Sequence, residues 1–358
     1  MGETFTVTTK ELSSQVELLQ SIVPKYPSNR ILENIRLIGN GKSIKMTASD
    51  GDTTITTTCN YKGDMFSAVV PPIPLKKILS ICGKKSEFNI HQKTVTITSD
   101  NHESVIPAFD VVDYPDYDIE EEPVLIIPMH SELCTAIKKS IAFVSNDELR
   151  VAMTRIMLDI KDTYITIVST DAHSMFIEKF EIADNIEKSV LLPTNGLGQL
   201  MDENGTLKLY RNFIEFIQSD YSLQSRLDNK SKYPDYESVI PEKKNYIGKI
   251  GFNKTEFIDA VNKVLTLQYD NYSHIQIEFI DNRLFISSTD YNKEKRFNIW
   301  LDGAASGVNK PFKINSKILF PLLESLDGDF VYMNFTKKKN IIVLSSNTQK
   351  RYITYVKV

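Results

Sequence analysis

The 358-residue sequence is poor in cysteine, has a single tryptophan and contains no long apolar run. Its three cysteines, Cys59, Cys82 and Cys134, are odd in number and widely spaced, which argues against a disulfide framework and predicts reduced, buried thiols. No stretch approaches the roughly 20 apolar residues of a membrane span. The N-terminus has no basic region followed by an apolar segment, so we expect no signal peptide and a cytoplasmic protein.

Motifs for catalysis and metal binding are also missing. The sequence has no Gly-rich phosphate loop, no CxxC, no HExxH and no GxSxG. Its five histidines lack metal-ligand spacing. His173 lies two residues after Asp171, but no nucleophile accompanies the pair, and a turn between two strands explains it better than acid–base chemistry. We therefore expect a non-enzymatic protein without a metal or another cofactor.

The charge balance is slightly acidic, with 42 basic and 46 acidic side chains and a net charge of −4. A simple nucleic-acid-binding domain is usually basic overall. A ring could still carry a positive inner surface and an acidic outside, which net charge does not reveal. The length allows two or three domains.

Two independent markers divide the chain into thirds. A strand ending in Ser/Thr-Asp occurs three times, with Asp50, Asp171 and Asp290 separated by 121 and 119 residues. The tetrapeptide YPDY occurs at residues 114–117 and again at 233–236, which is also a separation of 119. Two markers with one period indicate a threefold internal repeat.

Each third shows the same order of predicted elements. A short strand precedes an amphipathic helix, whose apolar residues recur at helical spacing, and alternating strands follow. The first helix is preceded by a capping box of Thr8 with Glu11, and the last repeat has Asn253 with Glu256. A second short helix is predicted at Pro74–Cys82, Asn195–Met201 and Asn315–Leu326, and closing strands at Phe88–Ser99, Leu207–Ser219 and Phe330–Ser345.

This order predicts an α+β fold of three repeated domains, each with two helices packed on an antiparallel sheet. Acidic and proline-containing punctuation between the repeats sets the domain boundaries. We expect an N-terminal domain at 1–122, a central domain at 123–244 and a C-terminal domain at 245–358.

Four segments then resemble the bacterial DNA polymerase III beta subunit, the beta sliding clamp family. Residues 149–176 resemble the family's arginine-led strand and T-D-G-H-R-L turn. Residues 225–241 resemble its S-R-L-D-G-x-Y-P-D-Y-x-x-V-I-P segment, and residues 311–326 its third-domain helix. The chain also ends, at 352–358, in a strand like that of the family. The resemblance covers the whole chain, in order.

The resemblance implies a DNA-clamp fold and a head-to-tail homodimer that closes into a ring, with helices lining the hole. It also implies a processivity factor that encircles double-stranded DNA independently of sequence. Its partners would be the replicative DNA polymerase, the clamp loader and other replication and repair proteins with clamp-binding motifs. No membrane partner is expected.

The candidate DNA contacts are basic side chains on the polar faces of the predicted helices. Flexible lysines suit phosphate attraction that permits sliding. The residues are Lys10, Lys76, Lys77, Lys138, Lys139, Lys254, Lys263 and Lys317, together with Lys25 and Arg30 in the loop where the family places a DNA contact.

The resemblance further implies a hydrophobic cleft between the second and third domains that captures short peptide motifs. Apolar groups with a few polar anchors suit such a ligand. The residues carried over by motif are Met153, Thr154, Thr170, Ala172, His173, Ser174, Met175, Pro234, Ser238, Val239, Thr354, Tyr355, Val356 and Lys357.

This chain departs from the family pattern at the rim of that cleft. Ala172 and Ser174 replace the glycine and arginine of the turn, and residues 354–357 replace the usual Met-Pro-Met-Arg type tail. We expect these changes to alter the preferred partner motif, with an aromatic contact from Tyr355.

Two other classes of function stay open at the level of the sequence. A β-rich adhesion or carbohydrate-binding protein would explain the repeat, but neither the lysine-bearing helices nor the missing secretion signal. The second is an enzyme whose site has an unrecognised pattern. Retention on circular but not on linear DNA would separate a clamp from both.

Overall fold

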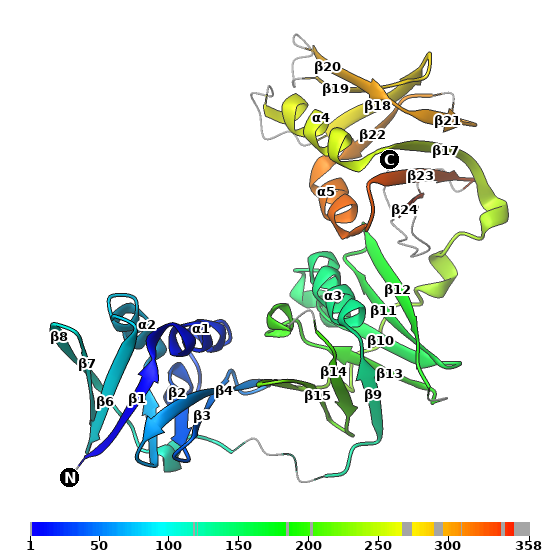
Figure 1. The fold of residues 1–358 in the computed structure, drawn as a ribbon. Coiled ribbons are helices and arrows are strands. Elements are labelled where there is room, and N and C mark those ends of the chain that lie inside the picture. Colours follow the sequence, from blue (N-terminus) through cyan, green and yellow to red (C-terminus); the bar gives the residue numbers. More distant parts are fainter. Residues whose placement is uncertain are drawn as a thin grey trace. The chain divides into compact units, whose positions relative to one another are not determined.

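Figure 1 shows the fold of the chain in a computed structural model. Its contacts form two compact units, residues 1–135 with 193–228 and residues 136–192 with 229–358, and we describe each unit by itself. Residues 123–244 contribute to both units. The structure describes residues 2–116, 119, 121–183, 186–200, 203–266, 274–289, 296–308, 310–337 and 341–346.

The first unit is built on one 12-stranded sheet. Its main path runs β8 (His102–Pro107), β7 (Thr94–Ser99), β6 (Lys85–His91), β1 (Glu3–Thr8), β4 (Thr53–Gly63), β16 (Tyr221–Arg226), β15 (Phe213–Gln218), β14 (Gly205–Leu209) and β9 (Leu125–Met129). Off this path lie β3 (Ser43–Ser49), which pairs β4 and β2 (Ile35–Gly39), and β5 (Phe66–Val70), which pairs β2.

The pairing of β4 with β16 joins the first repeat to the central one. Ile55 lies opposite Leu223 in this antiparallel register, and both side chains are fully buried. The hydroxyls of Thr53 and Ser225 are hydrogen-bonded across the junction at 3.2 Å. The junction therefore combines main-chain pairing with apolar burial, which explains why part of the central repeat belongs to the first unit.

Helix α1 (Thr9–Gln20) packs against α2 (Pro72–Leu79) and β4, as Figure 1 shows. Leu12, Val16 and Leu19 are buried at the predicted helical spacing. The predicted capping box is wrong, because the side chain of Thr8 makes no cap hydrogen bond. The Glu11 carboxylate instead accepts the backbone N–H of Asn60 on β4 at 3.0 Å, so it connects helix and sheet.

The second unit contains three four-stranded antiparallel sheets. One is β12 (Met175–Glu181), β11 (Tyr164–Thr170), β10 (Ile156–Lys161) and β13 (Lys188–Leu192). The others are β21 (Ala304–Ser306), β17 (Tyr246–Asn253), β23 (Phe330–Thr336) and β24 (Ile342–Ser346), and β20 (Arg296–Asp302), β19 (Arg283–Thr289), β18 (His274–Ile280) and β22 (Phe312–Asn315).

The helices of the remaining repeats are α3 (Ser131–Ser140), α4 (Lys254–Thr266) and α5 (Ser316–Ser325). The predicted asparagine cap of α4 is present, because Asn253 accepts the N–H of Glu256 at 3.1 Å. Asn315 caps α5 in the same way and accepts the N–H of Lys317 at 3.0 Å. Short 3₁₀ helices lie at Arg30–Glu33, Val111–Asp113, Ile141–Phe143, Glu148–Thr154, Leu197–Gln199, Glu237–Val239 and Lys243–Asn245.

The predicted second helix is realised differently in each repeat. It is α2 in the first repeat and α5 in the third, but in the central repeat the described part of Asn195–Met201 holds only the 3₁₀ turn Leu197–Gln199. Gly196, with φ +76°, precedes that turn, and Gly198 lies inside it, so the backbone favours a tight turn over a helix. Each predicted closing stretch is a hairpin, β6–β7, β14–β15 and β23–β24.

The antiparallel sheets and few helices confirm the predicted α+β class. All three cysteines are free, and Cys59 and Cys134 are buried as expected, whereas Cys82 is half-buried. Burial, with the charge of Glu11, raises the pKa of Cys59 to about 12. Among the described residues, no helix is long and apolar enough to cross a membrane.

Candidate partner-binding surface

The Asp171 turn, between β11 and β12, is closed by its own side chains. The Asp171 carboxylate accepts the backbone N–H groups of His173 at 2.8 Å and Ser174 at 2.6 Å. Thr170 donates its hydroxyl to the carbonyl of Ser174 at 2.6 Å and accepts the N–H of Ala172 at 3.1 Å. The turn leaves Ala172 and His173 exposed while Ser174 and Met175 are buried.

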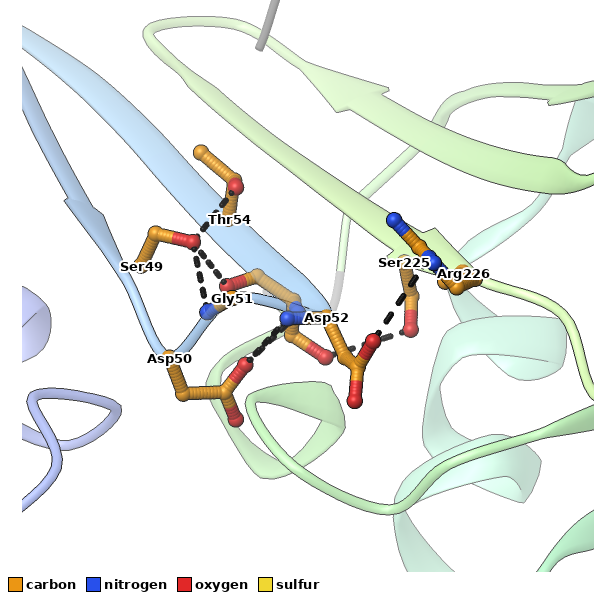
Figure 2. Close-up of polar contacts among 8 residues, drawn as sticks. Ser49, Asp50, Gly51, Asp52, Thr54, Ser225 and Arg226 are labelled. Atoms are coloured by element: carbon orange, nitrogen blue, oxygen red, sulfur yellow. Dashed lines mark hydrogen bonds and ion pairs between the residues drawn. The ribbon is translucent and has the colours of Figure 1, made fainter. Parts of the chain in front are cut away.

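The same turn occurs at Asp50 in the first repeat, shown in Figure 2. The Asp50 carboxylate accepts the N–H groups of Asp52 at 2.9 Å and Thr53 at 2.7 Å. The Ser49 hydroxyl donates to the carbonyl of Thr53 and accepts the N–H of Gly51, so it takes the part of Thr170 in the Asp171 turn. The repeated Ser/Thr-Asp therefore has a physical cause, because an aspartate oxygen satisfies the N–H groups of a tight turn.

A cluster of buried apolar side chains lies beside the Asp171 turn in the second unit. It joins the central repeat to β24 of the third, and Ala152, Tyr233, Val239, Ile240 and Tyr246 pack against it with partial exposure. The buried members are Met157, Val168, Met175, Ile177, Leu191, Tyr236, Ile341 and Val343.

The structure brings some of the predicted cleft residues together at this cluster. Met175 belongs to it, Val239 packs against it, and Met153 is buried nearby in sequence. Thr154 is half-buried, whereas Pro234 and Ser238 are exposed. The remaining predicted residues, Thr354, Tyr355, Val356 and Lys357, lie outside the described residues.

Sequence reasoning missed several residues of this surface. Leu149 is 94% exposed and Val151 is 45% exposed, so two apolar side chains face solvent just before Met153. Exposed apolar groups next to a polar rim are typical of interaction sites. Tyr236 was used only as a repeat marker, and its alternation with Asp235 and Glu237 in YPDYE was the signal that it points inward.

Asp159, on β10, connects the sheet under the cluster to the segment that carries Tyr236. The Tyr236 hydroxyl donates to one carboxylate oxygen at 2.7 Å, and the Ser189 hydroxyl donates to the other at 2.6 Å. Lys161 lies 3.4 Å from Asp159 and 2.6 Å from Glu237. Burial alone would raise the pKa of Asp159, but these hydrogen bonds and the charge of Lys161 hold it below its usual value.

The predicted DNA contacts of the first unit are mostly exposed. Lys10, Lys25, Arg30 and Lys77 are exposed, whereas Lys76 is half-buried and forms an ion pair with Glu17 at 2.8 Å.

The predicted DNA contacts of the second unit include three lysines with structural partners. Lys139 pairs with Asp327 at 2.7 Å, Lys254 donates to the carbonyl of Leu326 at 2.7 Å, and Lys263 pairs with Asp259. Lys138 is half-buried, and Lys317 is exposed.

Within the described part of the chain, no group of His, Cys, Asp or Glu side chains has the arrangement of a metal site. The Asp171 carboxylate accepts hydrogen bonds from His173 and Ser174 of its own turn, so its role in the structure is to close that turn. The geometry favours recognition of an apolar ligand over acid–base chemistry.

Residues 3–118 match the family model described as "DNA polymerase III beta subunit, N-terminal domain". The beta sliding clamp of Vibrio cholerae is 20% identical over 98% of both chains. The beta sliding clamp of Staphylococcus epidermidis is 24% identical over 89% of both chains.

Over nearly its whole length the chain is similar to beta sliding clamps. Solved clamps share its fold over the full length. The Pseudomonas aeruginosa clamp bound to griselimycin superimposes with a TM-score of 0.88 at 15% identity, with complete coverage of both chains. The Bacillus subtilis clamp gives a TM-score of 0.87 at 18% identity, covering 100% of this chain and 99% of that one.

Ala172 lies in the turn position that Gly51 takes in the first repeat, and its φ is +72°. A left-handed backbone is unfavourable for an L-residue with a Cβ. Ala172→Gly should therefore raise the free energy of unfolding by about 0.5–1 kcal/mol, measured by urea denaturation.

The matched control is Gly51→Ala in the equivalent turn, where φ is +102° and an added Cβ would meet nothing within 4 Å. This variant should lose about 1 kcal/mol or more, because only the backbone conformation opposes it. Destabilisation by Ala172→Gly would contradict the strain argument.

The lowered pKa of Asp159 makes a second prediction, about acid stability. The unfolded-state value is about 3.9, so the ionised carboxylate stabilises the fold fully above that pH and less as pH falls through the lower folded-state pKa. The wild type should have a higher free energy of unfolding than Asp159→Asn. This difference should be largest near neutral pH and become smaller in acid. A difference that is constant with pH, in urea titrations, would contradict it.

Proposed function

We propose that the chain is a DNA sliding clamp, a non-catalytic accessory subunit that encircles duplex DNA and tethers the replicative DNA polymerase. The whole-length similarity to curated beta sliding clamps carries this proposal. The repeated turn and sheet order support it, because a ring of similar domains needs repeats that expose equivalent edges. We propose the three domains at 1–122, 123–244 and 245–358.

Internal repetition supports a head-to-tail dimer. In the first unit, β4 of the first repeat pairs with β16 of the central repeat. By repeat position, β20 in the third repeat corresponds to β4, and β8 in the first repeat corresponds to β16. Both β20 and β8 end their sheets among the described residues. Pairing β20 of one copy with β8 of another would repeat the β4–β16 junction and cover both edges.

Side chains at these two edges fit such an interface. Val105 on β8 is 58% exposed, and Trp300 on β20 is also 58% exposed. A cavity of about 480 Å³ lies between α4 and β20, lined in part by Lys263, Arg283 and Trp300. Large apolar and aromatic side chains beside an unpaired strand are favourable interface cores.

Sequence-independent DNA binding would rest on the exposed cations. Lys10, Lys25, Arg30, Lys77 and Lys317 carry charges that no acidic side chain neutralises at the distances of an ion pair in the described residues. Attraction of such side chains to phosphates is long-ranged and releases counterions, so it weakens with salt and does not read bases.

The apolar cluster and its exposed neighbours support the peptide-binding function. We propose that polymerase, clamp loader and other replication and repair proteins bind here through short motifs, with Met175 and Val239 contacting apolar anchors. The smaller turn residues Ala172 and Ser174 would change the rim that such motifs contact.

The clamp function is tested by DNA topology. The protein, loaded onto nicked circular DNA by a clamp loader, should stay on the circle through gel filtration and leave when a restriction enzyme linearises it. A closed ring can slide off an open end but not off a circle, and linear DNA with protein-blocked ends should retain it.

Equal retention on circular and open linear DNA would contradict the proposal. A monomer that ignores DNA topology would favour a carbohydrate-binding or adhesion protein, which a glycan-binding assay would then detect.

The dimer is tested with the single tryptophan, Trp300. Its emission should shift to longer wavelength on dilution, because dissociation returns the indole to water. Val105→Lys, which places a charge on the proposed partner edge β8, should give the diluted spectrum at every concentration. Ile126→Lys is the control, since Ile126 is 49% exposed on β9, the opposite end of the same sheet. A monomeric mass for the wild type would refute the interface.

A further inference from the structure

Asp159 is a buried carboxylate in the middle of the β10 strand. Asp159 is 6% exposed, and the first five residues of β10, Asp159 among them, are all buried. Burying a charge is unfavourable unless several donors compensate it. An apolar side chain would fill the position without that cost, so the carboxylate has a specific task.

The repeat provides an internal comparison for this task. Asp159 lies opposite Thr166 in β10–β11, and the corresponding register position in β2–β3 holds Ile38 opposite Lys45. Ile38 is 36% exposed, and the first repeat forms the same hairpin and the same aspartate turn with it. The buried carboxylate is therefore not a requirement of the repeated fold.

The partners of Asp159 show what it adds to the central repeat. Tyr236 directs its ring into the apolar cluster and its hydroxyl to Asp159, and it is only 7% exposed. Lys161 forms ion pairs with both Asp159 and Glu237, and Glu237 is the residue after Tyr236. Two adjacent residues of one segment, Tyr236 and Glu237, are thus held to β10, and Val239, two residues further on, packs on the cluster.

We propose that Asp159 is a positioning residue for partner binding, which holds the segment 233–240 against the sheet as one preformed wall of the peptide-binding surface. This inference rests on the peptide-binding function proposed above. A wall that is already in place removes part of the ordering cost of binding. Loss of the contacts between Asp159 and this segment would lower the fraction of molecules with the segment in its binding position. The apparent Kd would rise by the same factor.

Two variants that each remove one hydroxyl donor to the same carboxylate separate positioning from stability. Tyr236→Phe frees the segment but keeps the buried ring, so the surface that a peptide would touch is unchanged. Ser189→Ala removes the donor on β13, which is part of the sheet and not of the wall. Both variants should lower the melting temperature by similar amounts.

The probe is a fluorescein-labelled synthetic peptide that carries the clamp-binding motif of a polymerase, titrated by anisotropy and followed by stopped flow. Tyr236→Phe should weaken binding about tenfold, mainly through a slower association rate, because it removes a hydrogen bond to a charged group, one of the two contacts that hold the segment. Ser189→Ala should change the Kd by less than about twofold. Lys161→Met, which removes the second tie, should fall between them.

The inference is overturned if Tyr236→Phe binds as the wild type does, or if Ser189→Ala weakens binding as much as Tyr236→Phe. If Tyr236→Phe does not fold, the comparison of Lys161→Met with Ser189→Ala decides in the same way. Failure of the wild type to bind the peptide would instead refute the proposed peptide-binding function, while the DNA-topology assay would still test the clamp itself.

Discussion

One short-range interaction recurs through the fold, the closure of a strand-to-strand turn by an aspartate carboxylate. At Asp50 and Asp171 the carboxylate accepts two backbone N–H groups that the turn would leave without a partner. The turn sets the register of β3 with β4 and of β11 with β12, and the register decides which side chains face the core. Sheet, core and candidate surface all depend on that register.

The two turns show how one repeated scaffold acquires different local properties. The first repeat has Gly51 at the left-handed position, whereas the central repeat has Ala172 and accepts backbone strain there. The first repeat has Ile38 where the central repeat has the buried Asp159. Both differences in the central repeat lie around the apolar cluster that we propose as the partner surface. Strain and buried charge are tolerated most often where a function requires them.

The sequence predicted the repeat, the α+β class and the amphipathic helices α1, α4 and α5, because these depend on the local spacing of apolar residues. It missed the interactions between segments far apart in the chain. Tyr236 and Asp159 are 77 residues apart, and Lys139 and Asp327 are 188 apart. It also predicted a central-repeat helix where glycine at 196 and 198 favours a 3₁₀ turn. Residues 354–357 lie outside the described residues, so their predicted contribution to the surface stays a prediction.

The amino-acid sequence by itself determined the period of the fold and the similarity to beta sliding clamps, because both are carried by local motifs in a fixed order. Only the tertiary structure decided how the Asp171 turn is used. Its carboxylate accepts backbone N–H groups of the turn, and His173 in that turn is exposed. The tertiary structure also decided which lysines form ion pairs with acidic side chains and which stay exposed. Ion pairing depends on distances in space rather than on positions along the chain.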